Sequence, residues 1–155
     1  MTLIASRPTT DDGRRLLTTH ELALVVRRVA SEPRRWRPHV SRAADAHEVQ
    51  LSGPVGVEVW LRNWLPAQQQ SLHDDGALAA FAVVEGTLTE VRDDDVLGSW
   101  ATVLQAPAVR VAERGLAYGL RNDHGRPAVT IHAYAPGLSS RLSADAAREG
   151  LSTTA

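Results

Sequence analysis

Short runs of β-branched and other apolar residues, separated by turn-forming residues, fill the chain after residue 45. Gly, Pro, Asn and Asp punctuate these runs, and no helical period passes through them. A series of short strands after one helical segment is typical of a sandwich or barrel. We therefore expect a mainly β protein built as a small barrel, with strands over 47–51, 55–64, 71–74, 79–85, 87–92, 99–104, 108–112, 116–122 and 127–134.

One helix is expected before the strands. Thr18 and Glu21 have the three-residue spacing of a capping box, in which each side chain accepts a backbone N–H of the first turn. Ser31-Glu32-Pro33 ends the helical pattern. Four aliphatic residues recur at helical spacing and predict a buried stripe: Leu22, Val25, Val26 and Val29.

The 155 residues are enough for one domain with a buried core. We assign residues 1–17 to a flexible arm, 18–138 to a single domain, and 139–155 to a tail with one short helix over 143–149. No stretch approaches the roughly 18 apolar residues that a membrane span needs, and we take a cytoplasmic location as the default.

The amino-acid composition limits the classes of partner that this protein can bind. The formal net charge is −1 and the pI is about 6.6, which leaves no basic surface for nucleic acid or an anionic membrane. Cysteine is absent, so disulfides, thiolate metal ligands and a cysteine nucleophile are excluded. A small-molecule ligand is the partner that we expect.

The last predicted strand, 128–134, has one polar and one apolar face. Its two-residue period places Thr130, His132 and Tyr134 together, whereas the residues between them are aliphatic. A barrel with polar groups in its interior would use such a strand to line a ligand cavity.

Two separate motifs resemble the cupins and, within them, the thiol dioxygenase branch known as the cysteine dioxygenase family. The first motif runs through 58–66, 72–74 and 81–90, and the second is 127–136, whose family counterpart ends in His-x-Tyr-Ser-Pro. The resemblance spans residues 18–138. It implies a cupin-type small β-barrel or jelly roll.

The resemblance also implies one Fe(II) held by three histidines, which oxidises a small thiol to a sulfinate with dioxygen. His73 matches the first metal ligand of the family. Asp75 stands at the second ligand position, and Tyr118, framed by Gly115 and Asn122, stands at the third. Two of the three implied ligands therefore differ from the family.

His132 and Tyr134 match the family's pair that orients bound substrate and oxygen, so the resemblance implies a catalytic role for both. The family's arginine for the substrate carboxylate has no match in this sequence. Arg42 or Arg62 could take its place, although neither aligns.

Three functions stay open at this point: a thiol dioxygenase of weak, altered or lost activity, an iron or manganese enzyme of changed specificity, and a metal-free cupin that binds a small ligand or a partner protein. Aspartate and tyrosinate would bring an Fe(II) site near zero charge, which disfavours unchanged chemistry. In the metal-free alternative, Asp75 caps the turn at Gly76 and Tyr118 fills the mouth of the barrel.

The remaining polar candidates have simpler interpretations. Asp93-Asp94-Asp95 lacks the spaced donors of a calcium loop and predicts a solvated hairpin turn. The other histidines lie in cap, loop or turn contexts, where we expect them to face solvent: His20, His39, His47 and His124.

Overall fold

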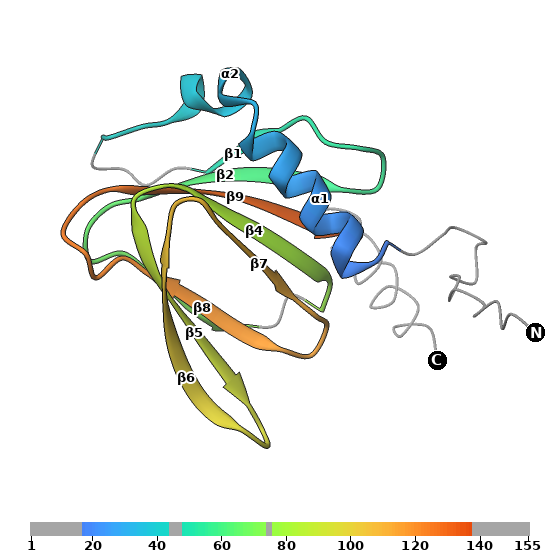
Figure 1. The fold of residues 1–155 in the computed structure, drawn as a ribbon, viewed down its shortest axis with the longest axis vertical. Coiled ribbons are helices and arrows are strands. Elements are labelled where there is room, and N and C mark those ends of the chain that lie inside the picture. The colour runs from blue at the N-terminus through green and yellow to red at the C-terminus, as the bar shows by residue number, and fades with distance from the viewer. Residues whose placement is uncertain (1–16, 44–47, 74–75, 138–155) are drawn as a thin grey trace, which may run out of the picture.

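The computed structural model describes residues 17–43, 48–73 and 76–137, which form two antiparallel sheets with helices on one side (Figure 1). The predicted helix over 143–149, most of the predicted arm and the predicted tail lie outside the described residues. In the part of the chain that the structure describes, no helix has the length and apolar character needed to span a bilayer.

The predicted strands are all present, and their antiparallel pairing confirms the mainly β class. The largest shift is in the run predicted over 55–64, which begins at Glu58 because Gly56 adopts a φ of 80° in a turn. One sheet has the order β1 (Glu48–Leu51), β2 (Glu58–Trp64), β9 (Ala128–Ala135), β4 (Leu78–Glu85) and β7 (Ala108–Ala112). The other has the order β3 (Gln69–His73), β8 (Ala117–Arg121), β5 (Thr87–Asp94) and β6 (Gly98–Gln105).

Helix α1 (Thr19–Ala30) lies across the outer face of the larger sheet (Figure 1). The predicted capping box is confirmed, since Glu21 N–H donates to Thr18 Oγ1 at 3.2 Å and Thr18 N–H donates to Glu21 Oε2 at 2.9 Å. The predicted stripe is buried at Leu22, Val26 and Val29, whereas Val25 is only half-buried at the edge of the packed face.

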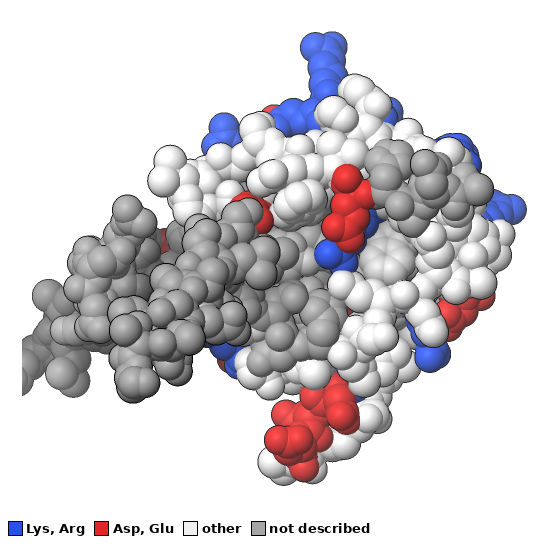
Figure 2. Space-filling model, turned by 180° about the vertical axis from the view of Figure 1, so that it is seen from behind, with Lys and Arg blue, Asp and Glu red and all other residues white. Residues whose placement is uncertain are grey.

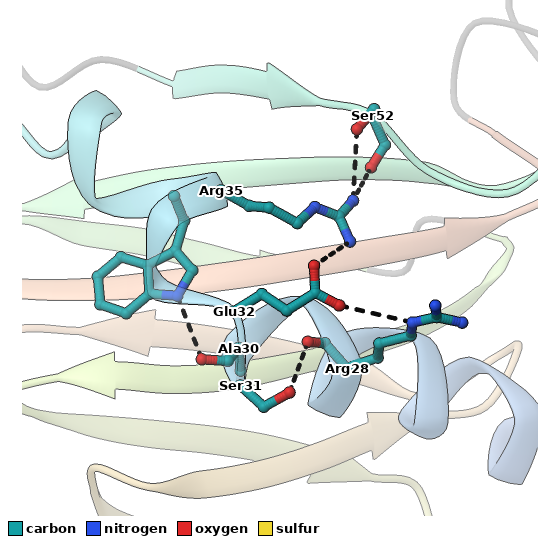
Figure 3. Close-up of polar contacts among 7 residues, drawn as sticks. Arg28, Ala30, Ser31, Glu32, Arg35 and Ser52 are labelled. Atoms are coloured by element: carbon teal, nitrogen blue, oxygen red, sulfur yellow. Dashed lines mark hydrogen bonds and ion pairs between the residues drawn. The ribbon is translucent and has the colours of Figure 1, made fainter.

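A second short helix, α2 (Pro33–Trp36), follows and leads into a 3₁₀ turn, η1 (Arg37–His39), and neither element was predicted. The proline that ends α1 also starts α2, because a proline fits the first turn of a helix. Trp36 Nε1 donates to the carbonyl of Ala30 at 3.2 Å, and Arg35 Nη2 donates to the carbonyl of Ser52 at 2.7 Å (Figure 3). These bonds fix α2 between α1 and the turn after β1.

Strand β9 is buried along its whole length because both of its faces are covered. Its aliphatic residues pack in the core under α1, and its polar residues point into the interior between the two sheets, as the two-residue period predicts. The interior core between the sheets is lined by Trp64, Ala79, Phe81, Val83, Leu88, Leu104, Ala112, Tyr118, Leu120, Ala128 and Tyr134.

The β5–β6 hairpin projects from the body of the molecule (Figure 1), and acidic side chains gather at its tip (Figure 2). Backbone N–H groups of Leu97 and Val96 each donate to Asp94 Oδ1 at 2.8 Å. These two bonds hold the pKa of the Asp94 carboxyl below its ordinary value of 3.8. The predicted solvated hairpin turn is confirmed.

Asp94→Asn is expected to destabilise the protein at neutral pH but not at low pH. Because the folded-state pKa is lowered, the charged carboxylate stabilises the fold above the unfolded-state pKa, and this contribution is lost as the pH falls through the folded-state value. The difference in unfolding free energy between parent and variant should be largest at pH 7 and should shrink as the pH is lowered to 3. A constant difference would show that the charge is irrelevant.

Candidate functional site

A hydrogen-bonded row of buried side chains crosses the interior from β2 to β9. Trp64 Nε1–H donates to Thr130 Oγ1 at 2.8 Å, and Thr130 Oγ1 lies 2.7 Å from His132 Nε2. Tyr134 Oη lies 3.5 Å from His132 Nδ1, so this last contact is long. Both ring nitrogens of His132 therefore face hydroxyl groups in either tautomer.

Two aromatic rings stack with the imidazole of His132. Phe81 on β4 has a centroid separation of 5.4 Å from it, and Tyr134 has one of 6.2 Å. Phe81 also stacks on Tyr118 of β8 at 5.9 Å. The structure thus brings Tyr118, His132 and Tyr134 into one buried cluster, and Phe81, to which sequence reasoning gave no role, joins them.

His73 ends β3, and its backbone pairs directly with that of Tyr118 on β8. Two segments far apart in the sequence are therefore adjacent at these predicted ligand positions. Asp75, the other predicted ligand, lies outside the described residues. The assignment of His73, Asp75 and Tyr118 as metal ligands stays a prediction.

The described residues do not fit the three-histidine Fe(II) centre that the resemblance implies. His132 is engaged in the hydrogen-bonded row, with Thr130 Oγ1 at 2.7 Å from Nε2 and Tyr134 Oη at 3.5 Å from Nδ1, so a metal at either nitrogen would have to displace a hydroxyl group. Tyr118 would supply a phenol where the family has an imidazole. Within the described ranges, no group of three or more His, Asp or Glu side chains gathers in a way that could hold a metal ion.

A buried charge cluster lies in the same interior. The Glu90 side chain has no exposed surface, and its Oε1 accepts from Arg92 Nε at 2.8 Å while its Oε2 accepts from Arg110 Nε at 2.8 Å. Arg92 Nη2 also donates to the carbonyl of Val111 at 2.7 Å. Two guanidinium groups and one carboxylate give this cluster a formal charge of +1.

Sequence reasoning missed this cluster, although a signal for it exists. Leu88, Glu90 and Arg92 occupy every second position of β5 and therefore share one face. This face points into the interior between the two sheets. Charged residues at the inward positions of a strand indicate a paired interior cluster. The partner Arg110 comes from β7, and its proximity depends on the long-range sheet order.

An open groove of about 300 Å³ borders Trp64, the first residue of the hydrogen-bonded row. Arg62 on β2 forms part of its wall, and the buried Trp64 connects it to Thr130 and His132. The groove is lined by Glu48, Arg62, Asn63, Trp64, Gln68, Gln69 and Gln70. A second open groove, of about 430 Å³, lies outside the barrel between α1 and the turn after β1, beside the contacts of Arg35 in Figure 3.

Asn122, which belongs to the second cupin motif, fixes the backbone at the end of the groove beside Trp64. Its Nδ2 donates to the carbonyl of Trp64 at 3.2 Å and to that of Arg126 at 2.7 Å. Gly115 has a φ of 83° in the turn between β7 and β8. Both residues serve the backbone geometry around the site.

The histidines predicted to face solvent do so where they are described. His20 and His39 are exposed, and His124 is exposed with its Nε2 at 3.1 Å from Thr89 Oγ1. His47 lies outside the described residues.

No protein-family model matches the sequence, and no curated protein matches it. Solved structures do resemble the fold. An uncharacterised protein with a double-stranded β-helix domain from Klebsiella pneumoniae aligns with a TM-score of 0.55 and 17% identity, covering 65% of this chain and 86% of that one.

A cupin 2 conserved barrel domain protein from Salinispora arenicola aligns with a TM-score of 0.51 and 12% identity, covering 64% of this chain and 83% of that one. Oxalate oxidase in complex with the substrate analogue glycolate aligns with a TM-score of 0.55 and 15% identity, covering 63% of this chain and 55% of that one. These similarities show that the fold is the cupin-type double-stranded β-helix.

Proposed function

We propose that this chain is a cupin that binds a small carboxylate-bearing ligand in the groove beside Trp64, and that it does so without a three-histidine iron centre. The observation that carries the proposal is the position of Arg62. Only 14% of its side chain is exposed, and it lies in the wall of a groove that also contains Trp64, the first residue of the buried row. A largely buried guanidinium at the edge of a cavity is suited to a planar anion.

The partner that Arg62 has in this structure is replaceable. Its Nε lies 2.8 Å from Glu48 Oε1, but the contact lacks hydrogen-bond geometry, and 51% of the Glu48 side chain is exposed. Glu48 can therefore rotate into solvent at little cost. A ligand carboxylate in the plane of the guanidinium group would form better hydrogen bonds with Arg62 than Glu48 does.

The electrostatics of the interior favour an anion over a cation. Arg92 lies directly opposite Tyr118 on the paired strands β5 and β8, so the charge cluster of +1 borders a predicted ligand position. Like charges in a region of low dielectric repel strongly, which weakens any cation site there. The same charge attracts a carboxylate.

A second candidate function is Fe(II)-dependent oxidation of a small thiol with dioxygen. The contact between His132 and Tyr134 supports it, because the resemblance places these two residues beside bound substrate and oxygen. The backbone pairing of His73 with Tyr118 also supports it. Stoichiometric iron in protein purified without chelators or an affinity metal would favour this candidate over the metal-free one.

Arg62→Gln is expected to weaken the binding of glycolate and of cysteine by roughly 10-fold or more, because a hydrogen bond to a charged group contributes about 1.5–3 kcal/mol. Isothermal titration of each carboxylate into the parent, with no metal added, should give saturable binding with one site per chain.

The matched control is Arg42→Gln, which removes a guanidinium that is 75% exposed and 3.9 Å from Glu85. This variant should keep the affinity of the parent. Equal affinity in the parent and Arg62→Gln, or no binding by the parent, would overturn the proposal.

A further inference from the structure

The outer edge of β6 is the least protected edge of the two sheets. An open edge exposes unpaired backbone donors and acceptors, and natural sheets blunt such edges with charge, proline, irregularity or shortness. Strand β6 spans eight residues and contains neither a charged residue nor a proline. Successive side chains of a strand point to opposite faces, yet residues Gly98–Ala101 are all exposed. Both faces are open here because the hairpin projects from the body of the molecule (Figure 1).

The other three edges among the described strands carry such devices. Strand β1 has only four residues and begins with Glu48, and β3 has a register shift between Gln70 and His73. Strand β7 carries Arg110 and lies in the sheet that α1 covers. Only β6 combines length, regular pairing with β5 and an uncharged sequence.

Apolar side chains accompany this open edge. Val103 is 62% exposed and Trp100 is 38% exposed, and at the hairpin tip Val96 and Leu97 are almost fully exposed. Trp100 and Val103 are three residues apart and therefore lie on opposite faces of the strand, so each face beside the edge carries an exposed apolar side chain that a paired chain would cover. The occupant of such an edge must be another strand, because only a strand matches the spacing of its backbone groups.

We propose that β6 pairs antiparallel with β6 of a second copy of this chain, which joins two four-stranded sheets into one continuous sheet. A strand is complementary to itself about a two-fold axis perpendicular to the sheet. Because β6 has no charged side chain, no register of this pairing opposes like charges. The inference is independent of the ligand proposed for the groove.

The first test is the mass in solution, measured by light scattering on the purified full chain over a range of concentrations. The parent should have twice the 16.8 kDa mass of one chain. Val103→Lys should be a monomer, because a lysine on the edge blocks strand pairing while it leaves the folded chain intact at an exposed position. The matched control is Val55→Lys, which adds the same charge at a fully exposed site before β2 and should stay dimeric.

The second test locates the contact and does not depend on a destabilising change. The chain has no cysteine, so Ala101→Cys, Thr102→Cys and Val103→Cys each introduce a single thiol. Residues near the two-fold axis approach their own copies, and mild oxidation should give a disulfide-linked dimer for at least one of the three. Val55→Cys should stay unlinked.

A parent that is monomeric at all concentrations would overturn the proposal. A dimer that survives Val103→Lys, or that forms without any of the three disulfides, would also overturn it, because the contact would then lie elsewhere.

Discussion

Glu90→Gln is expected to lower the free energy of unfolding by about 3–5 kcal/mol, although the two side chains have nearly the same shape. The substitution leaves the buried guanidinium of Arg92 and the partly exposed guanidinium of Arg110 without their shared carboxylate. Breaking a buried ion pair from one side is costly, because the remaining charge stays desolvated and unpaired. Denaturant unfolding of parent and variant at neutral pH measures the difference.

The matched control is Glu113→Gln, which makes the same chemical change at an exposed position between β7 and β8. Exposed substitutions of this kind usually change stability by no more than about 0.5 kcal/mol. If the two variants were equally stable, the cluster around Glu90 would not hold the two sheets together, and its charges would have to be solvated.

Replacing Asp75 and Tyr118 together by histidine is expected to raise the affinity for Fe(II) at least about tenfold. Residues that only contact metal ligands already change metal affinity by about this factor, and a change of the ligands themselves should have no smaller effect. The double substitution recreates the three-histidine set that the resemblance implies, with His73 as the third member. Neutral imidazoles bind without deprotonation of a phenol, which makes the change favourable. Calorimetric titration under anaerobic conditions compares the parent and the double variant.

The single variant Tyr118→His is the control, because it restores only one of the two altered positions and should gain less. Oxygen uptake with a small thiol that lacks a carboxylate tests whether the rebuilt site turns over. If a correctly folded double variant gained no affinity for Fe(II), Tyr118 would not occupy the ligand position, and the family's site could not be mapped onto this chain.

The strands and the first helix could be predicted because their signals are local. Alternation along β9 and the capping box at Thr18 each depend on residues within a few positions of one another. Helix α2 escaped prediction because Pro33 was interpreted only as the end of the first helix, whereas it also fits the first turn of a new one. Local sequence patterns were therefore enough to predict where most of the helices and strands lie.

The site itself could be predicted only in part. The two-residue period placed His132 and Tyr134 on one face, but the stacking of Phe81 on His132 depends on the pairing of β4 with β9, in which these two residues are partners although 51 positions separate them. The cluster of Glu90 with Arg110 likewise needs two strands from different sheets. Contacts of this kind depend on sheet order, which no single stretch of sequence encodes.

The place of β9 in its sheet has a consequence for how the chain acquires its structure during synthesis. Among the nine strands of the described residues this one comes last in the sequence, yet it lies between β2 and β4 and pairs with both. Until Ala128–Ala135 has left the ribosome, β2 and β4 each lack their central partner, and the apolar face of α1 has an incomplete surface to cover. Pairings between residues so distant in sequence form slowly, and the waiting strands expose edges in the meantime. Closure of the barrel is therefore a late step that follows translation of nearly the whole domain.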